Sequence, residues 1–318
     1  MAFRSFFNGT LLFLRTMTDQ LSHKAGYVAI VGEPNVGKST LLNALLNQKL
    51  SIVSARPQTT RQRVLGILSS EQFQIVFLDT PGLLQPKYLL HEKMVQSANL
   101  ALQDADVVLL LTEASRGTEL PEVVEQAAAS VAGQKKLLLI INKVDTVQRQ
   151  TVLPTIEHFA RSGKFADIIP ISALKGENLA DLQKTIVQYL PEHPPFYPAD
   201  AVSEQPERFF AAELIREKIF ELFREEVPYS TAVQIVDYKE RDKGKTYINA
   251  DIIVERDSQK GILIGKGGAA LKRIGQRARV DIEQMVGGPV FLDLHVKVRE
   301  KWREDESMLK RFGYSDDT

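Results

Sequence analysis

The sequence predicts an α/β protein: a domain built on a mostly parallel β-sheet, followed by a smaller α+β domain. Short apolar runs alternate with helical patterns from Tyr27 to Leu190, as in sheets covered by helices on both faces. The segment PEHPPFYP (Pro191–Pro198) then carries four prolines and indicates a semi-rigid linker. Beyond it, the order of strand and helix patterns changes. A length of 318 residues fits about two domains.

The first domain has strands made of near-continuous Val, Leu and Ile, which fits strands buried on both faces. The predicted strands are Tyr27–Val31, Arg63–Leu68, Phe73–Leu78, Asp106–Leu111, Lys136–Ile141 and Asp167–Ile171. Helices are expected to begin near Gly37, His91, Pro121, Thr151 and Leu179. Sheets of this kind bind ligands at the carboxyl ends of their strands.

The second domain is predicted to run helix, strand, strand, helix, glycine turn, helix, strand. Its first helix is Phe209–Phe223, with a charged surface at Arg216, Glu217 and Lys218. The predicted strands are, in chain order, Thr231–Tyr238, Thr246–Val254 and the half-exposed Val290–Val298. The helix after the glycine turn repeats apolar residues every three or four positions, namely Leu271, Ile274, Ala278, Ile282 and Met285. Trp302 could stack on a nucleic-acid base or pack under a final helix, and packing is preferred.

The predicted boundaries are an arm at residues 1–24, a first domain at 25–190, a linker at 191–207 and a second domain at 208–318. The arm has Arg4 and Arg15 around a short apolar stretch and no acid before Asp19. It fits a mobile extension, a targeting segment of an organellar relative, or an upstream start with Met17 as the true initiator.

Composition excludes several classes of site. The chain has no cysteine, which rules out disulfides, thiolate zinc sites and cysteine nucleophiles. No apolar run approaches the ~20 residues that span a bilayer. The formal net charge is zero, so any nucleic-acid site must come from local clustering of charge.

A phosphate-binding loop follows the first strand. The segment GEPNVGKS (Gly32–Ser39) fits G-x-x-x-x-G-K-[S/T] and precedes a helix. Its backbone amides are expected to surround phosphates, with Lys38 on the outer phosphates and Ser39 on Mg²⁺. The predicted nucleotide-binding residues here are Gly32, Glu33, Pro34, Asn35, Val36, Gly37, Lys38, Ser39 and Thr40. Others follow later strands: Asp79, Thr80, Pro81, Gly82, Asn142, Lys143, Asp145, Ser172 and Ala173.

The segment NKVD (Asn142–Asp145) predicts that the base is guanine. A carboxylate at Asp145 can accept from two N–H groups on the guanine edge, whereas adenine would leave it desolvated and unpaired. The backbone amide of Ala173 is expected to reach the guanine oxygen.

Two further segments complete a GTPase pattern. In DTPG (Asp79–Gly82), the aspartate can hold a water on Mg²⁺ and the Gly82 amide can sense the γ-phosphate. The stretch PQTTR (Pro57–Arg61) offers a threonine to the metal, with Thr60 preferred over Thr59. In this order the motifs resemble translation-factor-class P-loop GTPases, which implies metal ligation through Ser39, Thr60 and Asp79.

Hydrolysis is predicted to depend on an unusual set of residues: Asn35, Lys38, Thr60 and Gly82. Many GTPases carry a glutamine after the DxxG glycine to orient water, but this chain has Leu83 there. In related GTPases with an asparagine at the place of Asn35, that residue helps to bind K⁺. The resemblance therefore adds K⁺ to GTP/GDP and Mg²⁺ as an expected cofactor.

A second glycine-rich turn predicts RNA binding. Gly265–Gly268 (GKGG) is a G-x-x-G turn, and no acid occurs from Ser258 to Val280. The surrounding element order matches a type II KH domain, in which such a turn lets the nucleic-acid backbone approach closely. The predicted RNA-binding residues are Lys260, Ile264, Gly265, Lys266, Gly267, Gly268, Lys272, Arg273 and Arg277.

With these motifs, residues 25–314 resemble the Era family of bacterial ribosome-assembly GTPases. The tail residues LKRFGY, ending at Tyr314, also match. The resemblance implies a P-loop GTPase domain followed by a type II KH domain. It also implies binding to the 3′ end of 16S-type ribosomal RNA, action on the 30S subunit as a cytoplasmic monomer, and gating by GTP in a direction left open. The arm leaves room for peripheral contact with the inner membrane.

Three alternatives were weighed. A tRNA-modification GTPase would need an extra helical domain or a cysteine region, which this sequence lacks. A nucleic-acid-binding protein with a decayed P-loop conflicts with the intact Lys38, Ser39, Asp79 and Asp145. A membrane-surface protein is permitted by the arm but is required by nothing else.

Overall fold

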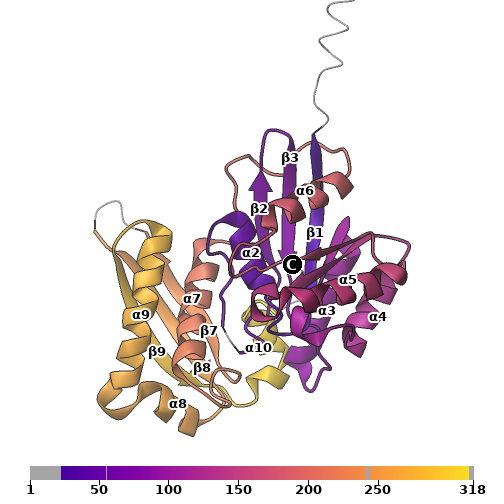
Figure 1. Ribbon diagram of the computed structural model, residues 1–318. Coiled ribbons are helices and arrows are strands. Elements are labelled where there is room, and N and C mark those ends of the chain that lie inside the picture. Colours follow the sequence, from indigo (N-terminus) through magenta and orange to yellow (C-terminus); the bar gives the residue numbers. More distant parts are fainter. Residues whose placement is uncertain (1–22, 55, 241–243, 315–318) are drawn as a thin grey trace, which may run out of the picture.

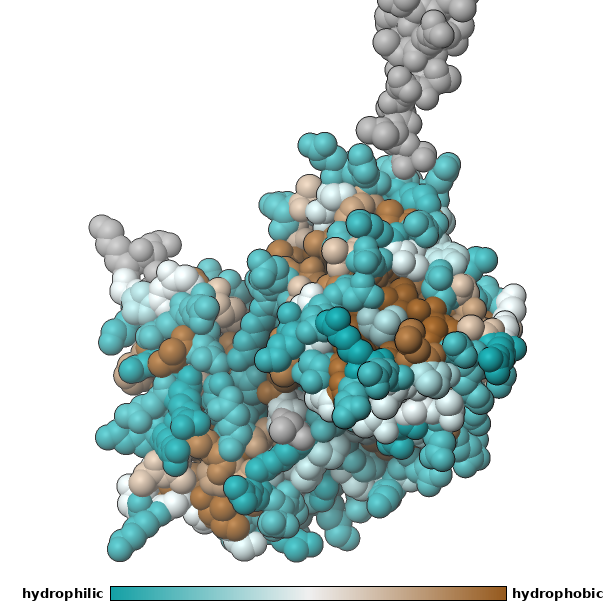
Figure 2. Space-filling view, in the orientation of Figure 1, coloured by the Kyte–Doolittle hydropathy of each residue, from teal (hydrophilic) through white to brown (hydrophobic). Residues whose placement is uncertain are grey.

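The computed structural model describes residues 23–54, 56–240 and 244–314. The arm at 1–24 therefore lies almost entirely outside the described residues. Two lobes sit side by side, the first-domain sheet in one and helices packed on a small sheet in the other (Figure 1). Exposed side chains are mostly hydrophilic on the visible face of both lobes (Figure 2).

The first domain is a six-stranded sheet in the order β2-β3-β1-β4-β5-β6. Its strands are β1 (Lys24–Gly32), β2 (Val64–Ser69), β3 (Phe73–Asp79), β4 (Val107–Glu113), β5 (Lys136–Asn142) and β6 (Asp167–Pro170). All neighbours run parallel except β2 and β3, which are antiparallel. The prediction of a mostly parallel sheet is confirmed, with strand ends shifted by at most three residues.

Helices cover both faces of this sheet. They are α2 (Lys38–Leu46), α3 (Leu89–Asp104), α4 (Glu122–Val131), α5 (Arg149–Arg161) and α6 (Leu179–Tyr189). One buried cluster joins the sheet to α3, α4 and α5, and a second joins it to α2 and α6. Helices α3 and α5 begin two residues before the predicted positions. Since both faces are sealed by helices, ligand access is left to the carboxyl edge of the sheet.

The second domain packs helices on one face of a three-stranded sheet, in the order β7-β8-β9. Its elements are α7 (Glu207–Leu222), β7 (Ala232–Lys239), β8 (Thr246–Val254), α8 (Asp257–Ile264), α9 (Ala269–Val286), β9 (Val290–Val298) and α10 (Glu306–Arg311). The predicted order is present. The apolar face of α9 enters the core through Ile274, Ala278 and Ile282.

One expectation about α7 is wrong. Arg216, Glu217 and Lys218 were predicted to form a charged surface, but they are 1%, 3% and 6% exposed. Helix α7 lies between its own sheet and the first domain, as Figure 1 shows, so both of its sides are covered. These charges are held by partners in the first domain and in α9 instead of by water.

The linker is fixed to the first domain. The side chain of Gln74 in β3 accepts from the backbone amides of Phe196 and Tyr197 and donates to the Tyr197 carbonyl. The hydroxyl of Ser203 donates to the Leu65 carbonyl. The proline-rich segment therefore follows the edge of the sheet and delivers α7 to a defined place.

An apolar cluster joins the C-terminal part of the chain to α3. Leu90 and Met94 of α3 pack with Trp302 and Leu309. Trp302 is fully buried and its Nε1 donates to the Ser230 carbonyl at 2.9 Å, which confirms the packing role. Helix α10 lies where the two lobes meet (Figure 1).

Candidate nucleotide and nucleic-acid sites

The P-loop connects the end of β1 to the start of α2. Gly37 has φ 100°, and a Cβ there would lie 2.3 Å from Asn142 Nδ2, so glycine is needed for this close approach. Lys38 is buried and its Nζ donates to the Gly32 and Glu33 carbonyls at 3.2 and 2.8 Å. Burial lowers the pKa of Lys38 to about 8, against the opposing pull of Asp79 and Glu33. A bound triphosphate would favour the charged form of this amine.

Oxygen atoms suited to Mg²⁺ converge beside the loop. Ser39 Oγ lies 2.8 Å from Thr60 Oγ1 and donates to Asp79 Oδ2 at 2.7 Å. Ser51 Oγ also donates to Asp79 Oδ2, whereas the buried Asp79 Oδ1 has no partner among the described residues. Burial raises the pKa of this carboxyl group. Hard oxygen donors with one carboxylate oxygen left unsatisfied fit a magnesium ion.

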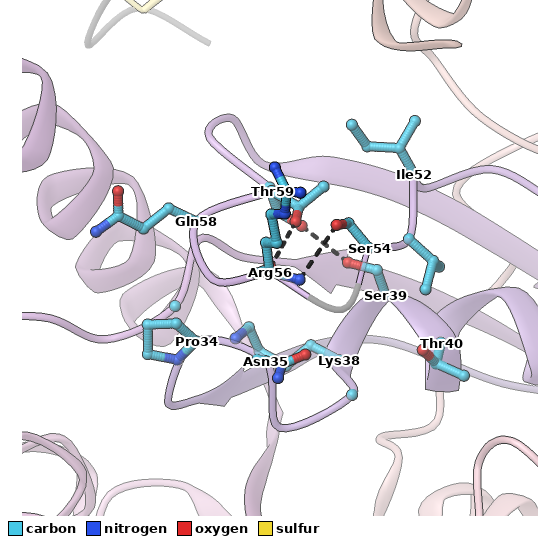
Figure 3. Close-up of a pocket in the computed structure, with 14 residues that line it drawn as sticks. Pro34, Asn35, Lys38, Ser39, Thr40, Ile52, Ser54, Arg56, Gln58 and Thr59 are labelled. Carbon is cyan, nitrogen blue, oxygen red and sulfur yellow. Dashed lines mark hydrogen bonds between the residues drawn. The ribbon is translucent and has the colours of Figure 1, made fainter. Parts of the chain in front are cut away.

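Of the two candidate threonines, the structure places Thr60 next to Ser39. Thr59 Oγ1 instead donates to the Arg56 carbonyl at 2.9 Å. The segment 50–63, called the switch segment below, lies over the P-loop, with Ser39 reaching across to it (Figure 3). The lining of this pocket includes residues that the sequence did not single out, among them Ile52, Ser54, Arg56 and Gln58.

The chain after β3 closes onto the P-loop. A Cβ at Gly82 would lie 2.6 Å from the Pro34 nitrogen, and the Leu83 amide donates to the Gly32 carbonyl at 2.9 Å. The Leu83 side chain is 5% exposed and belongs to the apolar core. It therefore has neither the chemistry nor the position to orient a water molecule.

The base-recognition residues are connected to one another by hydrogen bonds. Ser172 Oγ donates to Asp145 Oδ1 at 2.6 Å, which orients the carboxylate. Asn142 Nδ2 donates to the Val36 carbonyl at 2.9 Å, and Lys143 Nζ donates to the Asn35 carbonyl at 2.8 Å. Lys143 also pairs with Glu113. The segment predicted to bind guanine is thereby attached to the P-loop.

The contact of the Ala173 amide with guanine stays a prediction. This amide was predicted to reach the guanine oxygen, but it donates to Asn142 Oδ1 at 3.0 Å. One N–H group makes one good hydrogen bond. The Asn142 side chain lies between the P-loop and the loop after β6, where it accepts the hydrogen bond of the Ala173 amide. Sequence spacing could not show that competition.

The switch segment is docked on the second domain. Arg61 is 4% exposed and donates to the carbonyls of Pro228, Tyr229 and Thr231 at 2.7–3.1 Å. In return, Arg216 of α7 donates to the Thr59 carbonyl. The metal-site threonine is therefore flanked on both sides by residues held by the other domain.

A second set of contacts reaches the helix after the glycine turn. Lys49 pairs with Glu217 at 2.6 Å and with Asp281 of α9 at 3.1 Å. The Val53 amide donates to Glu217 Oε1 at 3.0 Å. Lys218 also pairs with Asp281, at 2.8 Å. The network thus links the switch segment to α9 through α7.

The predicted RNA loop is open to solvent. Gly265, Gly267 and Gly268 have φ values of 70°, 59° and 78°, and no atom lies within 4 Å of a Cβ built at Gly267 or Gly268. Lys266, Lys272, Arg273 and Arg277 are exposed, and Arg277 lies 3.5 Å from Glu221. Positive φ and free space on the same residues suit close approach by a phosphate backbone.

A groove runs from this loop between α9 and the edge strand β9. Of the predicted RNA residues it includes only Gly268 and Lys272. The structure adds several that the sequence missed: Lys245, Leu271, Gly275, Gln276, Arg279 and Phe291. Phe291 is 54% exposed and stacks on Tyr247. An exposed aromatic residue in an alternating strand was the signal that could have identified it.

No described helix is long and apolar enough to cross a membrane.

Two family models match the chain: one described as a 50S ribosome-binding GTPase at residues 27–143, and a KH domain at residues 226–303.

Full-length relatives are similar throughout. "GTPase Era" of Clostridium botulinum strain Hall is 45% identical over 92% of this chain and 98% of its own length, and that of Geobacter metallireducens is 47% identical with the same coverage. A crystal structure of Era with MgGDPNP and nucleotides 1506–1542 of 16S ribosomal RNA matches with a TM-score of 0.88 at 45% identity, covering 92% of this chain and 99% of that one. An Aquifex aeolicus Era variant bound to GDP·AlF4⁻ matches equally well.

Proposed function

The chain belongs to the GTPase Era family, and we propose that it binds and hydrolyses GTP with Mg²⁺ while its KH domain binds the 3′ end of small-subunit ribosomal RNA during 30S assembly. The relatives cover nearly the whole chain, so the inference extends to both domains. The observation that carries it is the meeting of Ser39, Thr60 and Asp79 beside the P-loop, with Thr60 in a segment docked on the KH domain.

We assign the nucleotide roles from the geometry. Lys38 would bind the outer phosphates, and Asp145, oriented by Ser172, would bind guanine. Ser39 and Thr60, backed by Asp79, would hold Mg²⁺, which when bound bridges phosphate oxygens and offsets their developing charge. The Gly82 amide would donate to the γ-phosphate once the contact between this segment and the P-loop opens.

Because Leu83 cannot orient water, the chemistry depends on positioning and charge. Asn35 lines the pocket, has φ 65° and is exposed, and its side chain makes no hydrogen bond to another described residue. Its amide oxygen is therefore available to a monovalent cation beside the phosphates. This supports the proposal that K⁺ takes part in hydrolysis.

GTP turnover is expected to be several-fold faster in K⁺ than in Na⁺ at equal ionic strength, because K⁺ beside the phosphates would stabilise the developing negative charge. Each tenfold change in rate corresponds to about 1.4 kcal/mol in the activation barrier. The measurement is phosphate release at saturating GTP in the two buffers. The Asn35→Ala variant should turn over at the same rate in both, while keeping GDP affinity. Equal rates for the parent protein would reject the K⁺ proposal.

The docking of the switch segment supports coupling between nucleotide and RNA. GTPase switch loops are ordered by the γ-phosphate and released on hydrolysis. Here the same segment is bonded to the KH domain through Arg61 and Arg216 and to α9 through Lys49 and Glu217. A relative was crystallised with a GTP analogue and RNA together. We therefore propose that the GTP-bound form is the one that binds RNA tightly.

The remaining assignments are proposals of the same kind. Residues 25–190 form the GTPase domain, 191–207 the linker and 208–318 the KH domain, supported by α7 beginning at Glu207. The protein works as a monomer in the cytoplasm, where ribosomal subunits assemble. A peripheral membrane contact through residues 1–24 stays a prediction, since those residues lie almost entirely outside the described part.

A further inference from the structure

A large cleft separates the two domains on the side of α7 away from α9. It has a volume of about 740 Å³, within the range of small-molecule sites. Its walls come from the start of β2, from α3, from the linker, from α7 and β7, and from the chain around α10. None of the residues that line it also lines the nucleotide pocket.

The lining of this cleft is strongly basic. Six cationic side chains face two acidic ones, Glu204 and Glu213. The cations are Arg61, Arg63, Lys93, Arg208, Arg216 and Arg311. They come from both domains, so an anion between them would touch both.

Among the described residues, one buried cation has no carboxylate partner, and a second has one N–H group without an acceptor. Arg61 donates to three carbonyl oxygens, has a hydrogen bond to the Tyr314 side chain and lies over the Trp302 ring, but no carboxylate pairs with it among the described residues. Arg216 is 1% exposed and pairs with Glu213 at 2.5 Å, but its Nη1 has no partner among the described residues. Burial lowers the pKa of Arg61, and the charge of Arg216 adds to this. A buried N–H donor without an acceptor is costly, so an anion in the adjoining cleft would relieve that cost at Arg216 and would supply counter-charge to Arg61.

Two further cations are available at the cleft mouth. Arg208 at the start of α7 and Arg311 at the end of α10 are exposed and make no hydrogen bond or ion pair to another described residue. Guanidinium groups bind phosphate oxygens bidentately. Phe209, Phe312 and Tyr314 line the same space and give it aromatic surface.

We propose that this inter-domain cleft is a second ligand site, which binds a small, multiply phosphorylated molecule of the nucleoside diphosphate class. Its phosphates contact Arg208 and Arg311, accept from the unpartnered Nη1 of Arg216 and supply counter-charge to Arg61. Because Arg61 and Arg216 also hold the switch segment, an occupied cleft favours the docked arrangement of the two domains. The site is separate from the P-loop and from the groove beside α9, so it does not depend on the function proposed above.

The test uses the full chain saturated with GDP and Mg²⁺, titrated with ADP by calorimetry. The guanine site is then filled and Asp145 discriminates against adenine, so ADP reports on the cleft. We expect saturable binding that weakens at least tenfold in the double variant Arg208→Gln/Arg311→Gln. The matched control is Lys164→Gln/Lys310→Gln, which removes the same charge from exposed lysines outside the cleft and should bind ADP as the parent does.

GDP affinity is measured on every sample, so a failure of the nucleotide site is distinguished from a failure of the cleft. The proposal is overturned by no ADP binding below millimolar concentration, or by equal affinity in the parent and the arginine double variant. It is also overturned if ADP does not bind but a short single-stranded RNA does so through Arg208 and Arg311, because the cleft would then belong to the RNA surface.

Discussion

The Asp145→Asn variant is expected to lose ~10³-fold in affinity for GDP, about 4 kcal/mol, and to gain affinity for xanthosine diphosphate. The carboxylate is held by Ser172 Oγ at 2.6 Å, next to the P-loop that would hold the phosphates. An amide there directs N–H donors at the N–H donors of guanine. Xanthine has a carbonyl where guanine has its amino group, so it accepts from the new amide.

The measurement is competition between the two diphosphates for the magnesium-loaded protein. Asp181→Asn is the matched control, since it removes a carboxylate that is exposed and paired only with Lys184. The control should keep the parent's preference for guanine. An Asp145→Asn protein that binds GDP like the parent would show that this aspartate does not bind the base.

The second large effect is expected in the KH loop. Gly267→Asp should weaken binding of a single-stranded 16S 3′-end RNA by ~10²-fold, about 2.7 kcal/mol, through a negative charge beside the phosphates. Gly267 has φ 59° and open space around it, so the side chain would point at the ligand instead of into the core. Filter binding or fluorescence anisotropy with a labelled oligonucleotide measures this loss.

The matched control for backbone strain is Gly163→Asp. Gly163 has φ 63° and nothing within 4 Å of its Cβ position, and it lies in the loop between α5 and β6. Both variants carry the same left-handed strain and the same added charge. An equal loss of RNA affinity in both would mean that strain or net charge explains the effect, and the loop would not be the RNA site.

Local sequence signals predicted most of the fold and the phosphate-binding chemistry. The P-loop and the guanine segment were identifiable because each places its residues at fixed spacing between a strand and a helix. Likewise, the periodicity of α9 identified its core face. These features depend on neighbours within about ten residues.

What the sequence could not predict depends on contacts between distant segments. Arg216 is predicted as a surface charge, but it is buried, and both Arg216 and Arg61 donate to carbonyl groups more than 150 positions away. The Ala173 amide was assigned to guanine because nothing in its spacing shows that Asn142 Oδ1 competes for it. Similarly, Phe291 lines the groove because β9 is the edge strand beside α9, which the sequence alone does not show. Hence the domain junction, which carries the coupling, had no local signature.

The central claim is that the nucleotide state controls RNA binding through the docked switch segment. The direct measurement is the affinity of the full chain for a 16S 3′-end oligonucleotide, loaded in parallel with a non-hydrolysable GTP analogue and with GDP. We predict at least ~5-fold tighter binding in the GTP-analogue state, about 1 kcal/mol of coupling. Equal affinities in the two states would contradict the account. The contacts of Arg61, Arg216 and Lys49 would then not couple nucleotide binding to RNA binding.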